Sequence, residues 1–188
     1  MKTFTILFML SFLLTSKSFS QNFWQQTNGP FGGIINAIAV DTSEDIFVGT
    51  NDIGIFRSTN GGINWSSVNN GLTNFHINTL SINPKGYIFA GSDIEGIFRS
   101  TNRGNSWELF IDGSLNRKVS SFVFDSAYII AATDSGVFRS SDDGESWIAS
   151  NITSFYPRFS NLAVSSQGDI FINVFRDFFR SSNMGEIG

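Results

Sequence analysis

Four carboxylates stand in the short segments that link strand-like stretches, and they are the first candidates for chemistry in this chain. They are Asp52, Asp93, Glu95 and Asp134. Glycoside hydrolysis uses two carboxylates about 5–10 Å apart, one on each side of the scissile bond. Connecting turns are polar in most proteins, so an ordinary acidic turn is the competing interpretation of each residue.

Composition excludes several other kinds of chemistry. The 188 residues include no cysteine and one histidine, His76. Thiolate sites, disulfides and multi-histidine zinc sites are therefore impossible. The formal net charge of −4 disfavours nucleic acid as a partner, because nucleic-acid binding needs a basic surface. We expect neither a metal nor a cofactor.

The first twenty residues have the pattern of a secretory signal peptide. Lys2 gives a positive start, Phe4 to Leu14 is an apolar run, and small residues at 18 and 20 predict cleavage before Gln21. The alternative, a membrane anchor, would need about 20 apolar residues. We predict a secreted protein, extracellular or periplasmic, with no membrane span after cleavage. Export without cysteines favours a bacterial source.

A repeat of 40–42 residues runs through the rest of the chain. A segment ending in Phe-Arg-Ser begins at positions 54, 96, 136 and 177, and tryptophans recur in step at Trp24, Trp65, Trp107 and Trp147. Each period holds four short strand-like segments, at 35–41, 45–51, 54–60 and 64–69 in the first. Four strands in about 41 residues match one blade of an all-β propeller. A β-solenoid is the alternative, although its coils are usually shorter.

The repeat also predicts how much of a propeller is present. The fourth period stops after its third strand, whereas residues 22–28 align with the fourth strand of a blade. Residues 21–188 would then form one domain of sixteen strands in four blades, either a small closed ring or an incomplete one. Because an open row of blades exposes an apolar face, we expect this sequence to be part of a larger propeller.

A tighter motif follows each of the first three Phe-Arg pairs. It joins a serine, an Asn or Asp, a glycine and a tryptophan at fixed spacing, and it resembles the Asp-box (BNR) repeat of sialidase-like propellers. Asn or Asp can accept hydrogen bonds from turn amides, glycine permits a positive φ, and tryptophan covers the hairpin. We therefore predict a structural role for Ser58, Asn60, Gly62, Trp65, Ser100, Asn102, Gly104, Trp107, Ser140, Asp142, Gly144 and Trp147.

The arginines that recur in the third strands are a further candidate site. They are Arg57, Arg99, Arg139 and Arg180. Equivalent positions in successive blades lie away from the axis, so these side chains cannot converge on one substrate carboxylate. We expect them to be solvated or to form hydrogen bonds between blades.

The resemblance implies two classes of function. Sialidases and some propeller endoglucanases carry Asp-boxes, but the Arg-Ile-Pro motif of sialidases is absent here. The resemblance also covers photosystem II assembly factors, sortilin-type ectodomains and sensor propellers, which bind or scaffold. We expect a secreted, non-catalytic propeller with a protein or carbohydrate partner, contacted at its two faces and at the opening of its channel, with the four acidic residues as candidates on one face. The alternative is a fragment of a propeller glycoside hydrolase that lacks its catalytic residues.

Overall fold

The computed structural model describes residues 25–110, 118–125, 127–150, 159–174 and 176–182, which form strands and turns without a helix. Each of four antiparallel sheets follows chain order from its first strand to its last. Blade 1 comprises β1 (Ile35–Val40), β2 (Ile46–Thr50), β3 (Ile55–Ser58) and β4 (Ser66–Ser67). Blade 2 comprises β5 (Ile77–Ile82), β6 (Ile88–Ser92), β7 (Ile97–Ser100) and β8 (Glu108–Phe110). Blade 3 comprises β9 (Val119–Phe124), β10 (Ile129–Thr133), β11 (Gly136–Ser140) and β12 (Ile148–Ala149), and blade 4 comprises β13 (Phe159–Val164), β14 (Ile170–Val174) and β15 (Asp177–Ser181).

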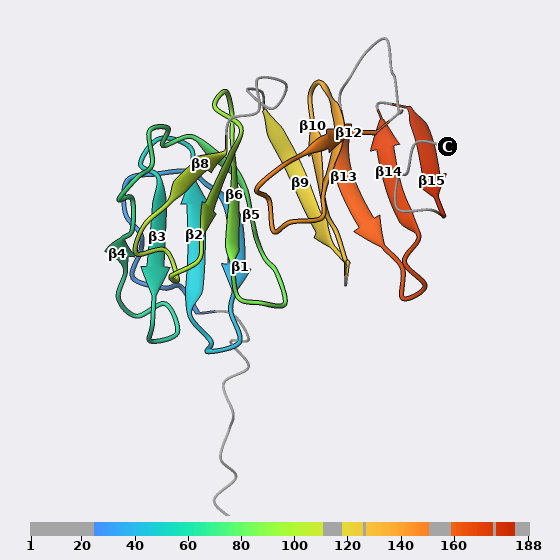
Figure 1. Cartoon of the computed structure of the whole chain (residues 1–188). Coiled ribbons are helices and arrows are strands. Elements are labelled where there is room, and N and C mark those ends of the chain that lie inside the picture. Colours follow the sequence, from blue (N-terminus) through green and yellow to red (C-terminus); the bar gives the residue numbers. More distant parts are fainter. Residues whose placement is uncertain (1–24, 111–117, 126, 151–158, 175, 183–188) are drawn as a thin grey trace, which may run out of the picture.

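The blades follow one another in a row, from blue to red in Figure 1. The first strands of neighbouring blades lie against each other, since β1 contacts β5, β5 contacts β9, and β9 contacts β13. Blades 1 and 4 lie at opposite ends of the row, so the ring is open (Figure 1). The prediction of an all-β propeller with about four blades, possibly an incomplete ring, is confirmed. No helix among the described residues could cross a membrane.

The hydrophobic core lies between blades. Phe47 and Ile55 of blade 1 form one cluster with Ile77 and Leu80 of blade 2. Two further clusters repeat this arrangement between blades 2 and 3 and between blades 3 and 4. The middle strands of blades 2 and 3 have a blade on both sides, which explains why apolar residues occur consecutively in β6 and β10 instead of alternating with polar ones.

Small residues in the second strands let the next blade approach closely. A Cβ added to Gly49 would lie 2.6 Å from Cγ2 of Ile77, and one added to Gly91 would lie 2.7 Å from Cβ of Val119. Real Cβ atoms do not approach neighbours this closely. Glycine at these two positions therefore sets the distance between a blade and the first strand of its successor.

One strand prediction is wrong in the part that the structure describes. Residues 25–28, which belong to the predicted strand at 22–28, have no strand conformation. In a closed ring that segment would pair with the third strand of blade 4. Here β15 lies at the far end of the row (Figure 1), so the segment has no strand to pair with. Residues 1–20 and Trp24 lie outside the described residues.

Because the core lies between blades, the same Ile→Ala substitution should destabilise the fold more at a junction between blades than on an outer strand. Ile77→Ala removes a side chain that is 0% exposed between blades 1 and 2, whereas Ile148→Ala changes a side chain that is 56% exposed on β12. Ile77→Ala should lower the free energy of unfolding by about 2–5 kcal/mol, and Ile148→Ala by about 0.5 kcal/mol or less. Denaturant titration measures both. Equal effects would contradict a core between blades.

Candidate functional site

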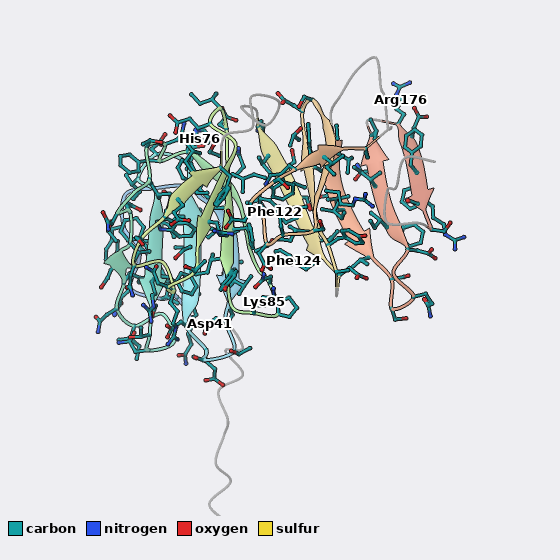
Figure 2. All side chains as sticks on the ribbon, viewed as in Figure 1. Asp41, His76, Lys85, Phe122, Phe124 and Arg176 are labelled. Atoms are coloured by element: carbon teal, nitrogen blue, oxygen red, sulfur yellow. The ribbon has the colours of Figure 1, made fainter. Side chains whose placement is uncertain are left out.

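The blades have two edges that carry different turns. Figure 2 places Asp41 and Lys85, from turns between first and second strands, at the lower edge, and His76 at the upper edge. Ion pairs join Asp41 to Arg103 and Lys85 to Asp143, which brings the turns between third and fourth strands to the lower edge as well. The four acidic candidates belong to turns between second and third strands. The upper edge is therefore the one that holds the candidate site.

Three turns at the lower edge share one hydrogen-bond pattern, and we call them the serine turns (residues 58–65, 100–107 and 140–147). The serine hydroxyl accepts the amide N–H of the glycine at 2.9 Å from Gly62 and 2.8 Å from Gly104 and Gly144. The Oδ1 atoms of Asn60, Asn102 and Asp142 each accept an amide N–H four residues on, at 2.9 Å. All three glycines have φ between 81° and 89°. The serine hydroxyl and the Asn or Asp side-chain oxygen of the motif thus each accept an amide N–H within their own turn.

The tryptophans complete these turns in two ways. Trp65 and Trp147 donate their indole N–H to the carbonyls of Gly62 and Gly144, both at 3.1 Å. Trp107 instead donates to the carbonyl of Val68 in the preceding blade, at 2.7 Å. The tryptophan of blade 2 therefore also joins two blades.

Two arginines of the third strands, Arg57 and Arg99, contact the next blade. Arg57 donates to the carbonyl of Arg103 at 3.3 Å, and Arg99 donates to the carbonyl of Asp143 at 2.7 Å. Each accepting carbonyl belongs to the following blade's serine turn. Arg99 is only 7% exposed, and it also pairs with Glu145 at 2.9 Å. These arginines hold adjacent blades together and do not converge on a ligand.

Titratable groups at the lower edge respond to the same contacts. Burial alone would raise the pKa of Asp41, but amide donors from Asp45 and Ser43 and the guanidinium of Arg103 outweigh it and hold that pKa below its usual value. The hydrogen bond to Asp143 raises the pKa of Lys85. The charged side chains of the lower edge therefore form contacts between blades.

The upper edge has a repeated feature where each second strand ends beside the start of a first strand. The amide of Asn51 donates to the carbonyl of Ile34 at 2.9 Å, Asp93 to His76 at 3.2 Å, and Asp134 to Lys118 at 3.0 Å. We call these three pairs the mouth: Ile34 with Asn51, His76 with Asp93, and Lys118 with Asp134. Because first strands are the ones in contact along the row, the mouth lies at the inner side of the blades.

The structure brings only some of the predicted acidic residues together. Asp93 and Asp134 occupy equivalent mouth positions of adjacent blades, and Lys118 joins them. Its ammonium group lies 3.5 Å from the carboxylate of Asp93, and its carbonyl accepts the amide of Asp134. Asp52 lies one residue beyond the mouth, where it accepts a hydrogen bond from Asn51. Glu95 accepts the hydroxyl of Thr73.

Two further residues, Lys118 and Phe75, contribute to this edge. The pairing of Lys118 with Asp93 depends on contact between blades, which local spacing does not reveal. Phe75 is 45% exposed, and its carbonyl accepts the amide of Gly54 in the turn that follows β2. An accessible aromatic ring thus lies near the mouth.

The described residues offer binding groups rather than a metal centre. No cluster of three or more His, Asp or Glu side chains among them is arranged to hold a metal ion. At the lower edge, a surface hollow of about 350 Å³ lies between blades 2 and 3, lined by Asn83, Lys85, Phe124, Tyr128 and Asp143 among others. That hollow is crossed by the ion pair of Lys85 and Asp143, so it is part of a blade junction.

Comparisons with known proteins show the fold alone. No family model and no curated protein matches the chain. An ancestral GH74 enzyme matches with a TM-score of 0.74 and 23% identity over 86% of this chain and 24% of that chain. The extracellular domain of a hybrid two-component system from B. thetaiotaomicron matches with a TM-score of 0.72 and 18% identity, over 86% of this chain and 23% of that chain. The GH74 xyloglucanase from Xanthomonas campestris matches with a TM-score of 0.65 and 15% identity, over 79% of this chain and 28% of that chain.

These matches define the class of protein. The chain has the β-propeller fold, and it spans about a quarter of the length of these three structures. At identities this low, the printed activities describe those proteins and not this chain.

The serine turn of blade 3 has Asp142 where the other two have an asparagine, so it predicts an effect of pH on stability that the other two lack. Burial alone would raise the pKa of Asp142, but hydrogen bonds from Ser146 and Ser140 lower it overall. A lowered pKa adds stability above the unfolded-state value, about 3.9, and that stability is lost as pH falls through the folded-state pKa. Asp142→Asn copies blades 1 and 2 and should reduce the loss of stability between pH 7 and pH 3. Urea midpoints at both pH values test this, and an unchanged difference would refute it.

Proposed function

We propose that this chain is part of a secreted propeller that binds a glycan, without catalysis, at the mouth of its upper edge. The serine turns are Asp-boxes in this proposal, and residues 1–20 are a signal peptide. Glycan binding is supported by charged and amide groups beside an exposed aromatic ring, a combination that hydrogen-bonds hydroxyls and stacks on sugar faces. Similarity in fold to the extracellular domains of hybrid two-component systems supports export.

The contacts of the acidic side chains support binding without catalysis. Asp93 is paired with Lys118, and Glu95 accepts a hydrogen bond from Thr73. Each of these carboxylates is held by a neighbouring donor, whereas a glycosidase needs two carboxylates aimed at one bond from opposite sides. Pre-positioned donors and acceptors of this kind suit a bound ligand that is not transformed.

The second candidate is a glycoside hydrolase that, unlike the fragment without catalytic residues considered from the sequence, carries its catalytic carboxylates in these blades. It is favoured by the two GH74 structures among the matches. In that case Asp93 and Asp134, from adjacent blades, would be the residues to test. Turnover of soluble xyloglucan or a fluorogenic glycoside that disappears in Asp93→Asn and Asp134→Asn would establish this alternative and overturn non-catalytic binding.

The mouth predicts which substitutions weaken binding. Glycan arrays and calorimetry with soluble xyloglucan should detect a ligand for the unmodified chain. Lys118→Met should reduce affinity about tenfold, because it removes one charged donor and leaves Asp93 unpaired. Lys85→Met, the same change at the lower edge, should leave affinity unchanged. Equal effects of the two variants, or capture of a protein partner with no glycan bound, would reject this site.

A further inference from the structure

The first strand of blade 1 exposes a face that blades 2 and 3 bury. Ile35, Ile38 and Val40 of β1 are 50%, 66% and 57% exposed. Their equivalents in β5, 42 residues further on, are Ile77, Leu80 and Ile82. We call the β1 side chains the leading face.

The repeat itself shows what covers a leading face. Ile77 is 0% exposed and Leu80 is 6% exposed, because Phe47 and Ile55 of the preceding blade pack on them. Phe47 and Ile55 are the second-strand and third-strand side chains that face the next blade. In blade 2 the same positions are held by Phe89 and Ile97, which pack on Val119 of blade 3. A leading face therefore fits a second-strand and third-strand pair from another blade.

Blade 4 presents that pair without a partner among the described residues. Phe171 and Phe178 occupy the positions of Phe89 and Ile97. Their rings stack with centroids 5.8 Å apart, and Phe178 is 70% exposed. We call these two side chains the trailing face. The chain thus carries both halves of one blade junction, at opposite ends of the row (Figure 1).

The leading and trailing faces also match in a polar contact, which involves Arg180. Arg57 and Arg99, at the same third-strand position, donate to a serine-turn carbonyl of the next blade. The side chain of Arg180 is 60% exposed and pairs with Asp169 of its own blade at 2.6 Å. The carbonyl it would reach in a following blade is that of Gly61, which is equivalent to Arg103 and Asp143. Gly61 has φ of 67°, close to 61° and 58° at those residues, so the acceptor turn is already formed.

We propose that a second copy of this chain docks head to tail, with the trailing face of each copy on the leading face of the other. Two copies of four blades close an eight-bladed ring, the upper end of the range of four to eight that is typical of propellers. A head-to-tail contact that closes forms a ring, and one that does not close forms a filament. The proposal does not depend on the glycan ligand.

The oligomeric state tests the proposal. The chain, expressed from its own Met1 and purified, should have twice the monomer mass in light scattering and sedimentation velocity. Ile38→Asp and Phe178→Asp each bury a charge at both junctions, so each variant should be a monomer. Mixed together, they should form a one-to-one complex, because one junction then has two unmodified faces. Formation of this complex also shows that both variants are folded.

Ile148→Asp is the matched control, because Ile148 is 56% exposed on the outer strand of blade 3 and belongs to neither face. It should remain a dimer. A monomeric unmodified chain would overturn the proposal and favour further blades of a longer chain as the cover. So would open-ended polymers, dissociation caused equally by Ile148→Asp, or failure of the mixed variants to associate.

Discussion

Packing of one blade's second and third strands on the first strand of the next blade is the interaction on which the rest of the structure depends. A blade of four short strands has two apolar faces and no core of its own, so its stability comes from its neighbours. Ile77 and Val119 are completely buried for this reason, whereas Ile35, in the same place on blade 1, is half exposed. Gly49 and Gly91 set how closely the blades approach.

Because each blade is stabilised by its neighbours, side chains at the two edges of the blades have different roles. At the lower edge, the serine turns of one blade receive arginines from the preceding one, so side chains there are committed to blade junctions. At the upper edge, backbone hydrogen bonds tie each second strand to the first strand of its own blade. Lys118 and Asp93 join two blades there, but their side chains remain 50% and 38% exposed, so they can also contact a ligand.

The sequence predicted the blades well because period and turn chemistry are local properties. Segments such as 35–41 and 45–51 agree with β1 and β2 within one residue at either end. The predicted strand at 22–28 failed in its described part because pairing there depends on where β15 lies, and no local pattern contains that information. The contact between Lys118 and Asp93 was not predicted for the same reason, since the two residues meet only through contact between blades.

Blades with nearly the same backbone could pack in the wrong order, and charges at the lower edge oppose this. Between blades 1 and 2, the cation is on the serine turn, where Arg103 pairs with Asp41 and Asp45. Between blades 2 and 3, the signs are reversed, and Asp143 pairs with Lys85. Placing blade 3 directly after blade 1 would set Asp143 against Asp41 and Asp45. The pair of Lys85 and Asp143, whose side chains are 62% and 34% exposed, adds little stability, so its effect lies in selecting the neighbour, since Asp143 would repel the carboxylates of blade 1.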